Sequence, residues 1–352
     1  MMTEQTTGTM KQFTMNVLNG LSMAILIALI PSALLGELTK AILPYFPSLQ
    51  FILDATTIAM RLLPAIIGLA VAMQFGRSIL EAGTIAIATY VGSGAVRIDE
   101  GAFVMAGIGD VITAGVTAAI ATLLVMKLAP HLKTYTVIVM PMTIIVVAGG
   151  IGTFLLTYIS QITTYIGLLI MTMTDLQPVL MGILIAMAFS LIIVSPISTV
   201  GIATAISLSG VAAGAANLGV VAAGFGLAIA GWQANATGTS IAHFLGSPKI
   251  QMANFVRRPI MMLPILANAA ILGALAGILK IEGTPISAGF GVSGLIGPVN
   301  ALHLMPGGFA LFNVLLVIVL FGLIPVALGI FFYRVFERAT LVKSDHYRLD
   351  FE

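Results

Sequence analysis

The sequence predicts an all-α polytopic membrane protein with about ten transmembrane helices and additional re-entrant hairpin segments. Of its 352 residues, 59% are hydrophobic and only 8% are charged, with a mean hydropathy of +1.12, whereas soluble domains carry about 25% charged residues. Several apolar runs reach ~20 residues with at most one charge, which is the length that crosses the hydrocarbon core of a bilayer. This composition excludes a nucleic-acid-binding protein, a cytosolic enzyme and a secreted disulfide scaffold as first interpretations.

Hydropathy places ten crossings along the chain. They are predicted at 17–36, 51–76, 82–96, 102–126, 137–159, 178–197, 198–213, 219–243, 260–279 and 308–332. The segment 285–305 is apolar but rich in glycine and proline, so we expect it to be re-entrant. Crossings 82–96 and 198–213 are short, since ~16 residues span only ~24 Å, and we expect them to be discontinuous or sheltered from lipid by protein. The predicted domains are a cytoplasmic segment at 1–16, a transmembrane domain at 17–333 and a cytoplasmic tail at 334–352.

The basic residues predict the orientation of these crossings. With the N-terminus in the cytoplasm, eleven lysines and arginines, Lys249 among them, fall on the cytoplasmic side, against Lys40, Arg97 and Lys280 outside. This distribution follows the positive-inside rule, provided that 285–305 re-enters the membrane from the outside. Both termini are therefore expected in the cytoplasm.

Two stretches, 68–150 and 182–273, echo each other in the same direction. GLAVAM at 68–73 matches GILIAM at 182–187, and further motif pairs follow at similar offsets. The pattern predicts a parallel internal repeat, which is typical of transporters with broken helices near the membrane midplane. The alternative is chance similarity between helices rich in alanine, glycine and isoleucine.

The stretch WQANATGTSIAHFLGSPK at 232–249 carries polar side chains into the predicted eighth crossing. On a continuous helix Asn235, Thr239 and His243 would share one face. A polar stripe inside a membrane must face protein or a water-filled path, and neutral donors and acceptors suit a polyol or a sugar. We predict that these residues bind a solute; the alternative is hydrogen bonding between helices.

Two motifs, SPISTVG at 195–201 and TPISAGFG at 284–291, predict a second part of the site. The proline of each motif breaks a helix. Ser195, Ser198 and Thr199 can then satisfy the freed backbone groups or bind the solute. The pairing predicts two hairpin tips that meet at one site; the alternative is an ordinary proline kink at a membrane boundary.

The stretch GLIGPVNALHLMPGG at 294–308 places Asn300 and His303 one helical turn apart, directly after a Gly-Pro break. Re-entrant segments are tolerated only where they line a cavity or are buried in protein. Asn300 and His303 are therefore predicted as solute-binding or gate residues, and Asn313 could join them.

Charges inside the predicted crossings need partners. Arg61 lies near the middle of 51–76, where a lone charge costs at least ~2.5 kcal/mol. We expect it to pair with Asp110 or Asp54 in a structural salt bridge. The alternative is a relay for protons or ions, which would indicate an ion channel or an ion-coupled carrier.

Other chemistry is not indicated by the sequence. The chain has no cysteine, which rules out disulfides and a phosphocysteine intermediate on this chain. It also has no Gly-Lys-Ser/Thr phosphate loop and no metal-ligand spacing among its four histidines. We therefore expect no metal and no cofactor. No complete catalytic centre is evident, so an enzymatic role stays open.

The ten-span pattern and three motifs, SPISTVGIATA, NATGTSIAHFLGSPKIQMANFVRRP and GPVNALHLMPGG, resemble the membrane EIIC component of bacterial sugar phosphotransferase systems. Within that group the chain is most similar to the EIIC-like family that includes a clostridial regulator of perfringolysin O. The resemblance covers nearly the whole chain. It implies a homodimeric, elevator-type transporter of a small polar solute, a sugar or a sugar derivative, in a bacterial cytoplasmic membrane.

The sequence departs from the family pattern in two respects. It has no EIIB domain to carry a phosphocysteine, and GLIGPVN at 294–300 is only a loose counterpart of the family's Gly-Ile-Thr-Glu-Pro-type motif, with Asn300 where a solute-binding acid is expected. Phosphorylation would therefore require an EIIB protein in trans. The alternative is a membrane-embedded solute sensor that regulates gene expression without net transport.

Overall fold

The computed structural model describes residues 2–285 and 287–349; the side chains of residues 2–9, 33, 34, 37, 38 and 41 are outside this description. The described chain is mostly helical and divides into two compact units. Unit 1 comprises Met1–Pro31 and Asp54–Ile162, and unit 2 comprises Ser32–Leu53 and Thr163–Asp350. The two halves of the predicted repeat thus fall in different units.

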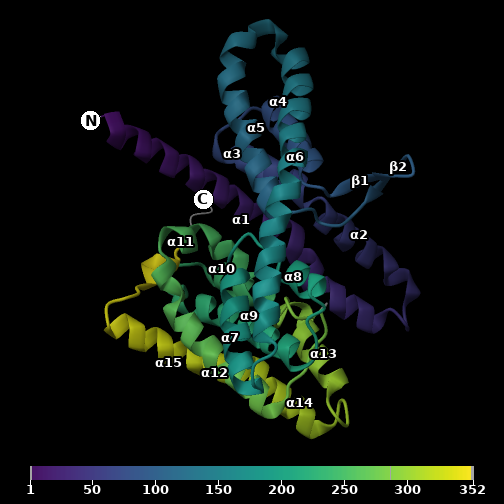
Figure 1. Ribbon diagram of the computed structural model, residues 1–352, viewed down its shortest axis with the longest axis vertical. Coiled ribbons are helices and arrows are strands. Elements are labelled where there is room, and N and C mark those ends of the chain that lie inside the picture. The colour runs from purple at the N-terminus through teal and green to yellow at the C-terminus, as the bar shows by residue number, and fades with distance from the viewer. Residues whose placement is uncertain (1, 286, 350–352) are drawn as a thin grey trace. The chain divides into compact units, whose positions relative to one another are not determined.

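Unit 1 is formed by helices and one β-hairpin (Figure 1). Its elements are the first part of α1 (Met2–Ile42), most of α2 (Gln50–Arg61), α3 (Leu63–Gln74), α4 (Ile79–Gly92), β1 (Val96–Asp99), β2 (Ala102–Met105), α5 (Val111–Leu132), the 3-10 turn Lys133–Tyr135 and the first part of α6 (Thr136–Met173). Helices α3, α4 and α5 pack against one another. A side chain at Gly92 would lie 2.8 Å from Thr117 Oγ1 and 3.0 Å from the Gly152 Cα, so small residues let α4, α5 and α6 meet almost backbone to backbone.

Local sequence sets where the helices of unit 1 begin and bend. Ser78 and Glu81 form a capping box at the start of α4, in which the Ser78 amide donates to Glu81 Oε2 at 2.8 Å. Helices α2 and α3 are bent by 54° at their junction, where Pro64 occupies the first turn of α3. The predicted crossing 51–76 is therefore a broken span, and Arg61 is the last residue of α2 rather than the middle of a straight helix.

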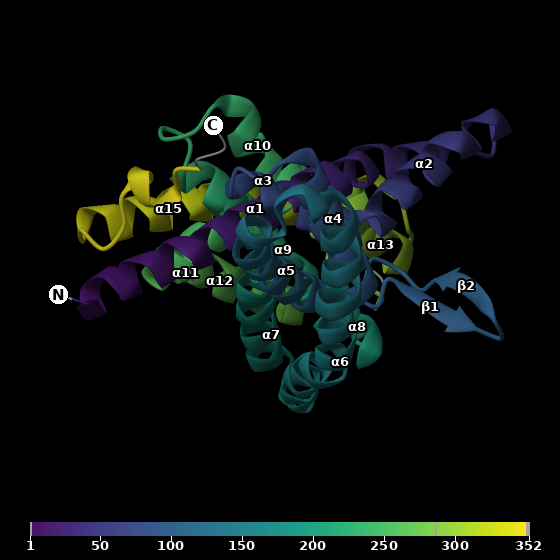
Figure 2. The ribbon, with the colours of Figure 1, turned by 90° about the horizontal axis from the view of Figure 1, so that it is seen from above.

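The crossing predicted at 102–126 is wrong at its start, because residues 102–105 form a strand of a β-hairpin. Strands β1 and β2 pair antiparallel, with Val96 opposite Met105, and the hairpin projects away from the helices of unit 1 in two perpendicular views (Figures 1 and 2). Glu100 and Gly101 form the turn, with φ values of 46° and 83°, as two-residue hairpin turns of type I′ require. Helix α5 begins only at Val111.

Unit 2 contains the remaining elements. They are the end of α1, the 3-10 turn Pro47–Leu49, the end of α6, α7 (Pro178–Ile192), α8 (Thr199–Ala205), α9 (Gly210–Ala230), α10 (Thr237–Leu245), the 3-10 turn Pro248–Gln251, α11 (Met252–Arg257), the 3-10 turn Pro259–Met262, α12 (Leu263–Leu279), the 3-10 turn Ser293–Leu295, α13 (Ile296–Leu304), α14 (Leu311–Ile318), the π-helical turn Val319–Leu323, α15 (Ile324–Arg338) and the 3-10 turn Ser344–Tyr347.

The core of unit 2 is formed by α7, α9 and α12, which contact one another extensively. Helix α9 is buried along almost its whole length. Glycines set the spacing: a Cβ at Gly182 would overlap the Gly273 carbonyl, and one at Gly219 would overlap the Ala186 carbonyl. Small residues at these crossings bring the helix backbones into direct contact, as in other membrane helix packings.

The structure supports a multi-pass membrane protein. In the described residues, five helical segments are long and apolar enough to cross a membrane, or six if the bent α2–α3 pair counts as one span. Ten crossings therefore stay a prediction. Two of the predicted crossings are not continuous helices: 198–213 contains the whole of α8, the 206–209 link and the start of α9, and 219–243 is interrupted between Ala230 and Thr237. The discontinuity expected for 198–213 is thus confirmed.

Candidate functional site

The two proline-containing segments 195–201 and 284–291 lie against each other in unit 2, and we call them the tip pair. The Thr199 hydroxyl donates to the Gly289 carbonyl at 3.1 Å, in a buried position. A Cβ at Gly289 would lie 2.6 Å from the Val200 amide nitrogen, so only glycine permits this approach. The predicted contact between the two segments is therefore present in the described residues, which do not include Ile286. That they form hairpin tips at one solute site stays a prediction.

The serines of the first tip shape its backbone. The Ser195 hydroxyl donates to the Ile192 carbonyl at 2.7 Å, at the end of α7. Ser198 is the N-cap of α8, and its hydroxyl accepts from the Gly201 amide at 2.9 Å. These side chains satisfy the backbone groups that the proline break frees.

Two asparagines hold the second tip. Asn300 Oδ1, from α13, accepts from the Thr284 amide at 3.0 Å and from the Ser287 hydroxyl at 2.8 Å. Asn217, from the buried helix α9, accepts from the Gly291 amide at 3.2 Å. Sequence reasoning found Asn300 but missed Asn217, although an amide in the middle of an apolar 21-residue helix is a signal that it needs a polar partner.

A buried lysine also bonds the backbone of the first tip. Lys249 Nζ donates to the Ser195 and Ile197 carbonyls, both at 2.6 Å, and only 6% of the residue is exposed. Burial lowers the pKa of Lys249 to about 7, because desolvation disfavours the charged form. The side of the membrane predicted for Lys249 stays a prediction, but its amine is buried and is part of the tip structure.

The predicted stripe on 235–243 is not one helix face. Helix α10 begins at Thr237, so Asn235 lies in the preceding turn and only Thr239 and His243 are on the helix. His243 is fully buried; its Nδ1 donates to the Ser240 carbonyl at 2.9 Å, which leaves Nε2 to accept from Gln251 Nε2 at 3.0 Å. The imidazole is neutral in this arrangement, because Nδ1 donates to a carbonyl while Nε2 accepts from an amide.

Asn235 belongs to a groove that holds the C-terminal tail. We call Asn235, Gln251 and Asn254 the tail groove. Its bonds are Asn235 Nδ2 to Tyr347 O (2.9 Å), Leu349 N to Asn235 Oδ1 (2.8 Å), Gln251 Nε2 to Tyr347 O (2.7 Å) and Asn254 Nδ2 to Arg348 O (2.6 Å). Tyr347 is fully buried and its hydroxyl donates to the Met261 carbonyl at 2.7 Å. The amide of Asn235 is therefore engaged by the protein itself.

His303 has a different environment from Asn300, although both are on α13. It is exposed, and its ring meets Phe309 edge-on at 5.0 Å between centroids. Asn313 fixes the turn after α13, since its Nδ2 donates to the Pro306 and Gly308 carbonyls, both at 2.9 Å. Among the residues predicted to bind a solute, His303 therefore differs from Asn300 in that its side chain does not stabilise the backbone of the tip pair.

In unit 1, Asp110 has a local role. It is the N-cap of α5, and its Oδ1 accepts from the Thr113 amide at 2.7 Å and from the Thr113 hydroxyl at 2.6 Å. The expectation that Asp110 lies a third of the way into a helix is wrong. Its pairing with Arg61, and that of Asp54 with Arg61, stay predictions.

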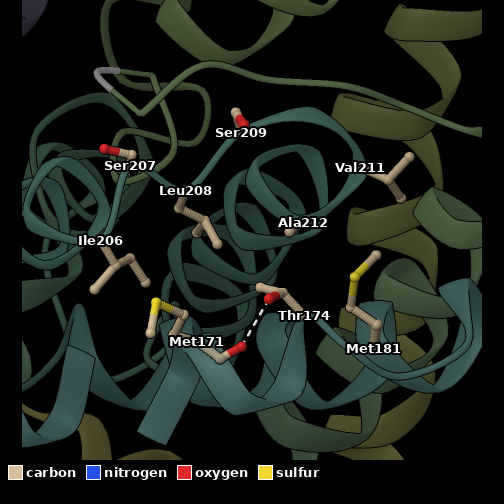
Figure 3. A pocket seen from close by; sticks show the side chains of 9 residues that line it. All are labelled: Met171, Thr174, Met181, Ile206, Ser207, Leu208, Ser209, Val211 and Ala212. Atoms are coloured by element: carbon tan, nitrogen blue, oxygen red, sulfur yellow. Dashed lines mark hydrogen bonds between the residues drawn. The ribbon is translucent and has the colours of Figure 1, made fainter. Parts of the chain in front are cut away.

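A cavity of about 260 Å³ lies in unit 2, where the start of α7 meets the link between α8 and α9 (Figure 3). Its wall is formed by the ends of α6 and α8, the start of α7, the 206–209 link and the first turn of α9. Methionine and aliphatic side chains line it together with the hydroxyls of Thr174, Ser207 and Ser209. None of these residues was predicted from the sequence as part of a site.

The sequence of the chain matches the model of a known protein family. The chain matches the family described as "Phosphotransferase system, EIIC" over residues 15–349, which is nearly its whole length. No curated protein and no solved structure matches it.

Proposed function

Because this chain belongs to the EIIC family of the phosphotransferase system, a family of membrane sugar-transport components, we propose that it transports a sugar or a sugar derivative bound between the two segments of the tip pair. The observation that carries this proposal is the Thr199–Gly289 bond, which joins the break between α7 and α8 to the non-helical segment between α12 and the 3-10 turn Ser293–Leu295, 90 residues further along the chain. Broken helices that meet inside a membrane protein are the usual place of a transported solute.

We assign the solute contacts to the tip pair and to α13. The hydroxyls of Ser195, Ser198 and Thr199 each bond a backbone group and each retain capacity for one further hydrogen bond to a solute. Asn300 and His303 approach from α13. In the described residues Asn300 Nδ2 makes no hydrogen bond, and His303 is exposed; both can therefore hold a sugar hydroxyl. Thr239 is a further candidate, whereas Asn235 and His243 serve the tail groove.

The wider mechanism follows from the family. We propose a homodimer in a bacterial cytoplasmic membrane, with both termini in the cytoplasm and an elevator movement of the solute-carrying part. The chain has no cysteine, so any phosphorylation of the solute depends on an EIIB protein supplied in trans. We expect transport of such a solute to require no metal and no cofactor on this chain.

The test compares two exposed histidines. Binding of hexoses, hexitols and N-acetylhexosamines is measured on the purified protein, and flux of the bound sugar is measured in proteoliposomes. We expect His303→Ala to weaken binding about 3–10-fold, the effect of one lost hydrogen bond, with an unchanged Tm. His131→Ala, at the exposed end of α5, should change neither quantity.

Two results would overturn the proposal. Equal affinity for wild type, His303→Ala and Thr199→Val would remove the tip pair as the solute site. Binding without flux, with or without a phosphorylated EIIB protein, would instead favour the alternative role of a solute sensor.

A further inference from the structure

The cavity of unit 2 is connected to the tip pair by one short helix. Helix α8 begins at Thr199 in the first tip and ends beside Ser207 in the cavity wall. Its seven residues span about 10 Å. The second tip segment also starts near the cavity, because Gly283 pairs with Gly210 through two 3.0 Å backbone bonds. Both segments of the tip pair therefore lead from the cavity to the proposed solute site.

Ser207 occupies a backbone position that favours glycine. Its φ is 52°, and it closes α8 in a Schellman motif, with Ser207 N bonded to Thr204 O at 3.1 Å and Leu208 N to Ala203 O at 2.8 Å. A serine there is strained where a glycine would not be. Ser207 is exposed, and in the described residues its hydroxyl has no hydrogen-bond partner within the protein, so it is available to a ligand.

Ser209 is a second serine whose hydroxyl the fold leaves unused. It is the N-cap of α9 with extended backbone angles of φ −136° and ψ 176°, yet its side chain makes no capping bond. A serine at this position normally accepts from an amide of the first turn. Ser209 is instead exposed at the cavity wall, two residues from Ser207.

The rest of the wall defines the chemistry of a ligand. No charged side chain lines the cavity, so an ion would lose its hydration without compensation. Met171 and Met181 provide an adaptable apolar surface opposite the serine link (Figure 3). The volume of about 260 Å³ is just below the ~300–1,000 Å³ of pockets for drug-sized ligands, which favours a molecule the size of a monosaccharide.

We propose that this cavity binds a small, uncharged, hydroxylated molecule through the Ser207 and Ser209 hydroxyls, as a waiting site next to the tip pair. The identification of that molecule with the transported sugar rests on the proposed function. The binding site itself rests on the cavity, on the two unused hydroxyls and on the strained backbone that positions one of them.

The first test uses two glycine variants. Ser207→Gly removes the hydroxyl and relieves the backbone strain of a positive φ. Lys280→Gly, at the end of α12 with φ 51°, relieves a similar strain away from the cavity. Glucose, sorbitol and N-acetylglucosamine are the probes, and Kd is taken from thermal shifts. We expect both variants to keep the wild-type Tm or exceed it, while only Ser207→Gly weakens the Kd of the tightest probe, by about 3–10-fold.

An unchanged Kd in Ser207→Gly overturns the inference, as does a wild-type protein that binds none of the probes. If binding is lost in His303→Ala but kept in Ser207→Gly, the proposed function stands and the inference fails.

The second test fills the cavity and uses the absence of native cysteine. Ser209→Cys is labelled with a bulky maleimide, and Glu282→Cys, exposed but not in the cavity wall, is the control. We expect labelling to lower sugar flux at least 10-fold at Ser209 and to leave it unchanged at Glu282. Unchanged flux after complete labelling, or a thiol at 209 that does not react, contradicts the inference. Absent flux in unlabelled wild type contradicts the proposed function instead and leaves the first test to decide.

Discussion

The ammonium of Lys249 donates a 2.6 Å hydrogen bond to the carbonyl of Ser195, 54 residues earlier in the chain. With its second bond, to the Ile197 carbonyl, it holds the backbone of the first tip. Among the described residues no carboxylate forms an ion pair with this ammonium. The carbonyl dipoles at the end of α7 favour the cation, and burial opposes it more strongly.

This balance predicts a pH dependence of stability. The pKa of Lys249 falls from 10.5 to about 7 on folding, so between these values the unfolded chain binds more protons than the folded one. Stability should therefore rise with pH from about 7 towards 10.5, with a slope of up to ~1.4 kcal/mol per pH unit for one proton. Tm against pH should show this rise in wild type and lack it in Lys249→Met, whereas Lys280→Met, at an exposed lysine, should keep it.

The tail groove predicts the effect of Asn235→Ala. This change removes the bonds to Tyr347 O and Leu349 N. Tyr347 O keeps its bond from Gln251 Nε2, but the Leu349 amide loses its partner, which costs about 1–3 kcal/mol. We expect a lower Tm with an unchanged affinity for solute. Thr239→Val, in the neighbouring helix, should leave Tm unchanged. A loss of affinity without a loss of Tm would restore the solute-binding hypothesis for Asn235.

The N-cap of α5 predicts different effects for two Asp110 variants. Asp110→Ala loses both bonds to Thr113 and should destabilise unit 1 by about 0.5–2 kcal/mol, whereas Asp110→Asn keeps an acceptor and should cost much less. Chemical unfolding of the purified variants measures both. Combining Arg61→Leu with Asp110→Asn then tests the predicted ion pair: additive losses would mean that the two residues do not interact.

The glycine contacts of the unit 2 core predict a sharp contrast between two alanine variants. Gly182→Ala places a Cβ against the Gly273 carbonyl, so the backbones must separate, and we expect a loss of more than ~2 kcal/mol. Gly238→Ala has no atom within 4 Å of the new Cβ and should keep the wild-type Tm. Equal Tm values for the two variants would contradict the packing of α7 on α12.

Periodicity and proline placement account for what the sequence predicts well. Pro196 lies in the break between α7 and α8, as predicted, whereas Pro285 lies in a non-helical segment after α12 and does not interrupt a helix. The repeated Pro-Ile-Ser sequence indicates that the two segments meet. The errors occur where hydropathy does not show a break. The turn at 231–236 contains Gln233 and Asn235, but a hydropathy window of ~19 residues averages it with its apolar neighbours. The sequence therefore places Asn235 on a helix face that does not exist.

Two other features depend on tertiary context. A lysine near a membrane boundary is normally solvated; only the fold shows that the Ser195 and Ile197 carbonyls surround Lys249. The hairpin did have a local signal, since Glu100 and Gly101 separate two strand-like runs. An apolar window that starts at 102 hides that signal.

The contacts of Gly182 with Gly273 and of Gly219 with Ala186 restrict which parts of unit 2 can act as hinges. Sliding of packed helices is normally accommodated by side chains that change rotamer at the contact, and these crossings have backbone carbonyls there instead. Helices α7, α9 and α12 should therefore move as one rigid body. Any opening and closing of the unit must come from the non-helical joints around it: the first tip after α7, the link at 206–209 and the segment that leads from α12 to α13.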